Sequence, residues 1–228
     1  MRHLAFLLLF SAATAHAAAP LATDKERDSY ALGQDVADSI KRNDADLDIN
    51  ALLQGLRDNL EGKQSLLNGV ELTAARDRGR NAMLQNRKAK LAADSALYGK
   101  AGQDFQAKHK AMPGVVTTAS GLQYQVLTAT PPGPRPGPAN RVVFEFKGSI
   151  VGGTNAEFDS SAAQGKVSVI GVSDGIKGWT EAFQLMTLGS KYRFVVPPQL
   201  AYGAQGLPGK VPPNATLVYE ITLREVAK

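Results

Sequence analysis

The second half of the chain contains five aromatic residues and one carboxylate that could together form a pocket for an apolar group. The aromatic residues come from separated segments: Phe146, Phe158, Trp179, Tyr202 and Tyr219. Asp159 directly follows one of them. Trp179, the only tryptophan, precedes a stretch typical of one or two helical turns, so its ring is expected at a helix start beside free backbone N–H groups. The simpler interpretations are that Trp179 fills a core and that Asp159 caps a turn.

The rest of the sequence lacks the residue types that covalent or metal chemistry needs. There is no cysteine, and the three histidines are His3, His16 and His109. The first two lie in a segment expected to be removed, and His109 lies in a predicted helix. The C-terminal half therefore has no base or thiol for Ser-His-Asp or Cys-His catalysis and no Cys or His ligands for zinc. We predict no metal and no cofactor.

The charge pattern also excludes some partners. The formal net charge of +5 is spread thinly, with acids and bases alternating through most of the chain, so no nucleic-acid-binding surface is predicted. A phosphate-binding loop of the form G-x-x-x-x-G-K-[ST] does not occur.

The N-terminus has the three regions of a secretory signal peptide. Arg2 and His3 precede an apolar run from Leu4 to Phe10, and small residues follow with A-x-A spacing. We expect a signal peptide at residues 1–17, cleaved after Ala17 or Ala19. The apolar run is too short to span a bilayer, so no membrane span is predicted. The expected location is periplasmic or secreted, with outer-membrane association left open.

Two short helices are predicted next. Thr23 and Glu26 have the spacing of a capping box for a helix that runs to about Lys41. A second helix, Asp48–Leu60, has leucines at helical spacing. Both helices are short and apolar on one side, so their apolar stripes need a partner.

A long third helix is predicted from about Leu72 to Ala111, because this stretch contains no proline. Thr73 is the expected N-cap, and Pro113 with Gly114 supplies the stop. Gly99 and Gly102 weaken the helix locally and are a candidate hinge. The apolar side chains along it are mostly small, which favours a solvated spacer over a core element.

From residue 113 onward, β-branched residues, aromatic residues and turns replace alanine and charge. Alternating patterns predict four strands: Gly121–Leu127, Arg141–Ile150, Lys191–Val196 and Leu217–Arg224. The inward residues expected in the second and fourth are Val142, Phe144, Phe146, Leu217, Tyr219, Ile221 and Leu223. The proline-rich run at 131–138 predicts a stiff surface loop. The predicted fold class is α+β, with a C-terminal antiparallel sheet wrapped on one short helix and an all-α region before it.

Four motifs in this half resemble those of the FKBP-type peptidyl-prolyl cis-trans isomerases. In chain order they are Phe158-Asp159-Ser160-Ser161, Ile176-Lys177-Gly178-Trp179-Thr180-Glu181, Leu200-Ala201-Tyr202-Gly203 and Pro212-Pro213-Asn214-Ala215-Thr216-Leu217-Val218-Tyr219. Their order and spacing are specific, and the resemblance covers the chain from about Pro113 to its end. Upstream, Asp24 to Gly33 and the two later helices are similar to the exported macrophage infectivity potentiator group, in which N-terminal helices form a homodimer.

The resemblance implies a role for each matching residue. Asp159 and Tyr202 would be catalytic, with Asp159 near the twisting imide and the Tyr202 hydroxyl bound to a substrate carbonyl. The backbone N–H of Ile176 would bind another carbonyl, and Trp179 would form the pocket floor. The other implied substrate-binding residues are Phe146, Phe158, Val172, Leu207, Val211 and Tyr219.

The sequence departs from the family pattern at several positions. Phe146 stands where many members have tyrosine, so a hydroxyl near Asp159 is expected to be lost. The other departures lie at the rim, at Gly175, Leu207 and Lys210 and in the region of Val167 and Ser168. A cationic Lys210 favours acidic residues near the substrate proline.

The resemblance implies a prolyl isomerase that assists the folding of exported proteins, with macrolides as inhibitors. Its partners would be proline-containing unfolded or partly folded proteins and a second copy of the chain. The alternative left open is a chaperone or protein-binding module with little isomerase turnover. The implied organisation is a signal peptide at 1–17, a helical dimerisation region at 18–70, a connecting helix at 71–112 and an isomerase domain at 113–228.

Overall fold

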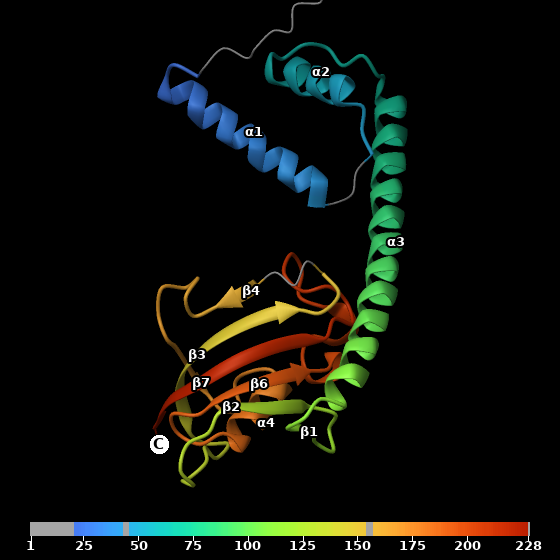
Figure 1. Cartoon of the computed structure of the whole chain (residues 1–228). Helices are drawn as coiled ribbons and strands as arrows, with labels where there is room; N and C mark the ends of the chain where they lie inside the picture. Colours follow the sequence, from blue (N-terminus) through green and yellow to red (C-terminus); the bar gives the residue numbers. More distant parts are fainter. Residues whose placement is uncertain (1–20, 43–45, 154–156, 228) are drawn as a thin grey trace, which may run out of the picture. The chain divides into compact units, whose positions relative to one another are not determined.

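The computed structural model describes residues 21–42, 46–153 and 157–227, so the predicted signal peptide at 1–17 lies outside the described residues. The chain divides into two compact units, residues 1–43 and 44–228. The described part of the first unit is helix α1 (Asp24–Arg42; Figure 1). Its predicted capping box is confirmed: Thr23 Oγ1 accepts from the Glu26 N–H at 3.2 Å, and the Glu26 carboxylate accepts from the Thr23 N–H at 2.8 Å.

The second unit begins with helices α2 (Ile49–Leu60) and α3 (Gly69–Lys110). Asp48 caps α2 by accepting a hydrogen bond from the Ala51 N–H at 3.0 Å, which confirms the predicted second helix.

The helix α3 starts earlier than the sequence suggested. Its N-cap is Asn68, and Glu71 completes a capping box with it. The prediction that Thr73 caps this helix is wrong, because Thr73 lies inside the first turns and its hydroxyl donates to the carbonyl of Gly69 at 2.9 Å. The residue three positions after Asn68 is a glutamate that closes the box, whereas the one after Thr73 is Arg76, which cannot.

The C-terminal part of α3 is not a solvated spacer, because it packs against the strands that follow it. The candidate hinge at Gly99 and Gly102 stays a prediction. The helix is continuous through Gly99 and Gly102, and Gly102 is buried. A Cβ at Gly102 would lie 3.0 Å from the Cβ of Thr216, so the missing side chain lets the helix approach the chain segment before the last strand. His109 is also buried, with its Nδ1 2.9 Å from the side-chain oxygen of Gln123.

The described residues after α3 form a seven-stranded antiparallel sheet in the order β1-β2-β6-β7-β3-β4, and β5 also pairs with β3. Figure 1 shows the central strands lying side by side. The strands are β1 (Val115–Thr117), β2 (Gln123–Thr128), β3 (Arg141–Ile150), β4 (Glu157–Ser160), β5 (Ser168–Gly171), β6 (Lys191–Val196) and β7 (Leu217–Ala227).

Alternation along the strands places the core on one face of this sheet. In β3 and β7 the buried residues include those predicted from the pattern: Val142, Phe144, Phe146, Leu217, Tyr219, Ile221 and Leu223. Helix α4 (Lys177–Leu185) packs on this face, and its Phe183 ring lies 4.9 Å from that of Phe144, edge to face. The predicted α+β fold class is confirmed.

Two 3-10 turns, η1 (Pro198–Leu200) and η2 (Gly203–Gln205), flank Tyr202 between β6 and β7. Residues 131–138 contain no helix or strand, as predicted for the proline-rich run. Among the described residues, no helix is both long and apolar enough to cross a membrane.

Candidate functional site

Trp179 lies at the centre of an aromatic cluster between α4 and the sheet. It is the third residue of α4, whose first turn starts from Ile176 as the N-cap. Its ring centroid lies 5.2 Å from those of Phe144, Phe146 and Tyr219, and each pair is arranged edge to face. Such packing fixes the indole more firmly than burial alone, because the edge of one ring meets the electron-rich face of the next.

The cluster borders an open cavity of about 410 Å³. Its lining residues come from the segment before α4, from α4 itself, from the turn between η1 and η2, and from β7: Asp174, Gly175, Ile176, Trp179, Tyr202 and Tyr219. The structure therefore brings Ile176, Trp179, Tyr202 and Tyr219 together, as the sequence predicted. This volume is at the lower end of the range for small-ligand pockets.

The two tyrosine hydroxyls remain protonated in this environment. Burial raises the pKa of Tyr202, and the negative charge of Asp159 raises it further. Burial raises the pKa of Tyr219 far above its usual range, with Tyr202 and Asp159 adding to the effect. Both side chains are therefore neutral hydrogen-bond donors at physiological pH.

Asp159 lies in β4, where it pairs with Gly148 of β3 next to Phe158. Its Oδ1 accepts a hydrogen bond from the amide of Gln164 at 2.9 Å. Its charge acts on both tyrosines, so the carboxylate lies within electrostatic reach of the cavity. Phe146 supplies no hydroxyl near Asp159, as expected from the sequence, and Tyr219 is the second tyrosine whose pKa the charge of Asp159 raises, after burial and Tyr202.

The remaining predicted residues surround the cavity lining or lie in the core beside it. The ring of Phe158 packs edge to face on that of Tyr219, with 6.0 Å between the centroids. Val172 is fully buried in the core. Leu207 and Val211 form an antiparallel bridge with two 2.8 Å hydrogen bonds, and Val211 is buried. Phe146, Phe158, Val172, Leu207 and Val211 do not line the cavity itself.

Two N–H donors at the cavity have no partner within residues 21–42, 46–153 and 157–227. Among the described residues, the backbone N–H of Ile176 meets no acceptor, since Ile176 precedes the first turn of α4. The indole Nε1 of Trp179 is buried and has no hydrogen-bond partner in the described part of the chain. Unsatisfied donors are rare in folded proteins and are expected where a ligand supplies the acceptor.

Sequence reasoning missed Asp174 as a lining residue and treated Gly175 only as a departure at the rim. A Cβ at Gly175 would lie 3.3 Å from the Trp179 ring, so glycine leaves the ring open at this point. No sequence signal identified Asp174, because a single aspartate before a glycine is the usual composition of a turn. Val167, Ser168 and Lys210 do not line this cavity.

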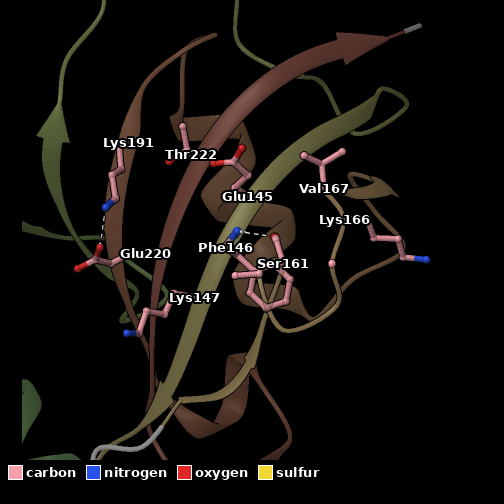
Figure 2. Close-up of a pocket in the computed structure, with 11 residues that line it drawn as sticks. Glu145, Phe146, Lys147, Ser161, Lys166, Val167, Lys191, Glu220 and Thr222 are labelled. Atoms are coloured by element: carbon pink, nitrogen blue, oxygen red, sulfur yellow. Dashed lines mark hydrogen bonds and ion pairs between the residues drawn. The ribbon is translucent and has the colours of Figure 1, made fainter.

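Figure 2 shows a second cavity, of about 450 Å³, that shares only Phe146 with the aromatic cluster. Its other walls include Glu145 and Lys147, which alternate with Phe146 along β3. Several of its charged side chains are paired: Lys191 binds Glu220 at 2.8 Å, and Arg224 binds Glu145 at 2.8 Å. This cavity differs from the first one because its walls carry several charged side chains and only one aromatic ring, that of Phe146.

The comparisons with known proteins agree with this geometry. Residues 133–224 match the family of FKBP-type peptidyl-prolyl cis-trans isomerases, and residues 25–126 match the domain amino-terminal to such isomerases. The chain is 34% identical to the outer membrane protein MIP of Legionella longbeachae, over 97% of this chain and 94% of that protein. It is also 34% identical to the peptidyl-prolyl cis-trans isomerase Mip of Coxiella burnetii, over 94% of this chain and 92% of that one.

A solved structure extends the likeness to the fold. The crystal structure of FkpA from Escherichia coli matches with a TM-score of 0.68 and 32% identity, over 91% of this chain and 99% of that one. The resemblance predicted from the four motifs is thus confirmed over nearly the full length. The chain belongs to the FKBP-type peptidyl-prolyl cis-trans isomerases of the Mip and FkpA group, and by that membership it is a prolyl isomerase.

Proposed function

We propose that this isomerase assists the folding of exported proteins by binding X-Pro segments in the cavity of Trp179, Tyr202 and Ile176. The observation that carries this proposal is the meeting of an indole, two protonated hydroxyls and a free backbone N–H in one cavity. In this proposal the proline ring packs on Trp179. Tyr202 and the N–H of Ile176 each donate to a carbonyl of the substrate.

The chemistry follows from the nature of the imide bond. Rotation about X-Pro must break the resonance of the amide, a barrier of about 18–20 kcal/mol. The twisted imide has lost the charge separation that this resonance gives the planar form, and water stabilises the planar dipole more. A cavity walled by aromatic rings therefore favours the twisted state relative to the planar one. The two donors hold the flanking carbonyls while the bond turns.

Asp159 has an electrostatic part in this proposal. Its charge favours the protonated form of Tyr202, which is the form that donates to the substrate. No metal or cofactor enters the reaction, because rotation makes and breaks no covalent bond.

The test is two-dimensional NMR exchange on a Leu-Pro or Phe-Pro peptide with catalytic amounts of protein. Tyr202→Phe removes one donor and should lower kcat/KM by about tenfold or less, the range of one hydrogen bond. Asp159→Leu should also lower it. Enhanced exchange that both variants reduce supports the proposal. Binding without enhanced exchange would make the chain a proline-recognising chaperone, the alternative named above.

We also propose that the chain is a homodimer, with residues 18–70 as the pairing region, 71–112 as the connecting helix and 113–228 as the isomerase domain. The support is the apolar stripe of α2, whose exposed residues include Ile49, Leu53, Leu56 and Leu60. Burying such a stripe is favourable by about 25 cal/mol for each Å² removed from water. Light scattering at micromolar concentration tests this, and a monomer there contradicts it.

Export is proposed from the N-terminal sequence pattern, with the periplasm or the exterior as the location. The name of the Legionella longbeachae relative, an outer membrane protein, agrees with a protein that leaves the cytoplasm. Fractionation of cells that express the full chain, with N-terminal sequencing of the product, tests both the export and the cleavage after Ala17 or Ala19.

A further inference from the structure

The segment before β7 contains an unusual backbone conformation at Asn214. Its φ is 56°, and among the described residues it is the one non-glycine residue with a positive φ. Asparagine tolerates this left-handed conformation better than most residues, although it remains less favourable than the right-handed one. Contacts around Asn214 must therefore hold it in place.

Asn214 is bonded in two directions. Its side-chain amide donates to the Oγ of Ser95 in α3 at 2.7 Å. Its backbone N–H donates to the carbonyl of Gly203 at 2.9 Å. Gly203 directly follows Tyr202, so a single residue links the long helix to the turn that carries the proposed substrate donor.

The surrounding contacts hold the same segment against α3 and against the residue after β3. The Gln106 amide donates to the Oγ1 of Thr216 at 2.9 Å, and the N–H of Val151 donates to the carbonyl of Thr216 at 3.0 Å. Gly102 has no side chain to keep α3 away from Thr216. Asn214 is thus the point at which a well-anchored segment meets the Tyr202 turn.

The other backbone hydrogen bonds of the Tyr202 turn are mostly local, and Gly206 packs closely on the backbone of residues 211–213. The carbonyl of Tyr202 accepts from the N–H of Gly206 at 3.1 Å, a bond within the turn. Gly203 and Gly206 both have positive φ, at 59° and 65°. Glycines widen the range of accessible backbone conformations, so the bond from Asn214 limits where the turn can place the tyrosine.

We infer that Asn214 is a positioning residue for catalysis, which uses Ser95 of α3 to fix the Tyr202 hydroxyl against the substrate carbonyl. This inference rests on the proposed role of Tyr202. A hydrogen bond weakens steeply when its angle or length departs from the preferred range. A small shift of the turn therefore lowers the benefit of the Tyr202 donor, even when the fold is unchanged.

The experiment places Asn214→Gly and Ser95→Ala in both the native chain and the Tyr202→Phe chain. Glycine accepts the positive φ at 214, so this variant removes the amide without straining the backbone. In the native chain each variant should lower kcat/KM for a Leu-Pro peptide by about two- to tenfold, no more than Tyr202→Phe itself does. The division of the loss between kcat and KM should match that of Tyr202→Phe.

In the Tyr202→Phe chain the same variants should cause no further loss, because the group that they position is absent. Asn214→Asp should retain most of the activity, since aspartate tolerates the same backbone conformation and its carboxylate accepts from the Ser95 hydroxyl. A circular dichroism spectrum that matches the native one establishes that each variant is folded.

The outcomes separate this inference from the proposed function. If the variants lower kcat/KM equally in the native chain and in the Tyr202→Phe chain, Asn214 acts on the fold as a whole. That result overturns the inference. No loss in either background overturns it too, while the role of Tyr202 stands if Tyr202→Phe alone lowers activity. A Tyr202→Phe chain with native activity overturns the proposed role of Tyr202 and, with it, this inference.

Discussion

Gly102 of α3 faces Thr216 so closely that a Cβ on the glycine would overlap the threonine Oγ1 and lie 3.0 Å from its Cβ. Three residues earlier in the same helix, a Cβ on Gly99 would lie 3.8 Å from the Cβ of Asn214, an ordinary van der Waals distance. The two glycines therefore offer a matched pair of substitutions. Replacing either glycine by alanine adds the same methyl group, but the surroundings of the two methyl groups differ.

Gly102→Ala should destabilise the chain, because the added methyl group must displace Thr216 or the helix. Overpacking of this kind costs about 1–3 kcal/mol, against a gain of about 1 kcal/mol in helix propensity. Gly99→Ala should raise the free energy of unfolding by about 0.5–1 kcal/mol, since only the propensity changes. Urea unfolding followed by the fluorescence of Trp179 measures both. Equal effects of the two variants would contradict close packing at Gly102.

Tyr219→Phe should lower isomerase activity although it leaves the aromatic wall in place. Burial is the main cause of the raised pKa of both tyrosines, and the two hydroxyls also act on each other. Tyr219→Phe removes this polar neighbour of the proposed Tyr202 donor, and neighbouring polar groups polarise and strengthen such a hydrogen bond. We expect kcat/KM to fall by about two- to fivefold in the NMR exchange assay. Phe144→Leu, which changes a buried ring against Trp179 outside the cavity lining, serves as the packing control.

The free energy of unfolding should fall as the pH rises above about 10, the pKa of tyrosine in an unfolded chain. Burial raises the pKa of Tyr219 in the folded protein, so the folded state keeps its proton where the unfolded state has lost it. Below this pH both states are neutral, and the contribution of Tyr219 is fully present. Urea unfolding by circular dichroism between pH 8 and 11 measures the fall, and Tyr219→Phe should make it shallower. An unchanged slope in that variant would exclude Tyr219 as the cause.

Sequence patterns predicted the features that depend on the local spacing of residues, namely which strand residues face the core and where a helix starts. Alternation placed Phe146 and Tyr219 on the inner face of the sheet, and the Thr23 and Glu26 spacing gave the start of α1. The cavity residues Ile176, Trp179 and Tyr202 came from motifs whose order is specific to the family.

The contacts of α3 with Asn214 and Thr216 were not predicted, because they join residues more than a hundred positions apart. From the sequence, Gly102 was expected only to weaken the helix locally. The fold reveals that Thr216 lies opposite it. Asn214 was singled out as part of a motif, but nothing in its neighbours indicates the bond to Ser95. Such long-range partners depend on how the elements pack and leave no periodic pattern in the chain.

Asp174 should give the isomerase a preference for basic residues next to the substrate proline. It is the charged residue in the lining of the aromatic cavity, which includes neither lysine nor arginine. The sequence had instead favoured acidic neighbours on account of Lys210. That residue lies in the exposed turn closed by Leu207 and Val211, outside the lining. The two residues therefore predict opposite preferences.

Peptides with Lys, Gln or Glu beside the proline decide between them. We expect the kcat/KM of the native chain to be about two- to fivefold higher for the Lys peptide than for the Gln peptide, the range of an exposed ion pair. Asp174→Asn should abolish this difference. The effect should shrink at high salt, because exposed charges are screened. Lys210→Gln, the matched control, should leave the ranking of the peptides unchanged. If Lys210→Gln alters the ranking and Asp174→Asn does not, the rim lysine determines specificity and the carboxylate in the cavity does not.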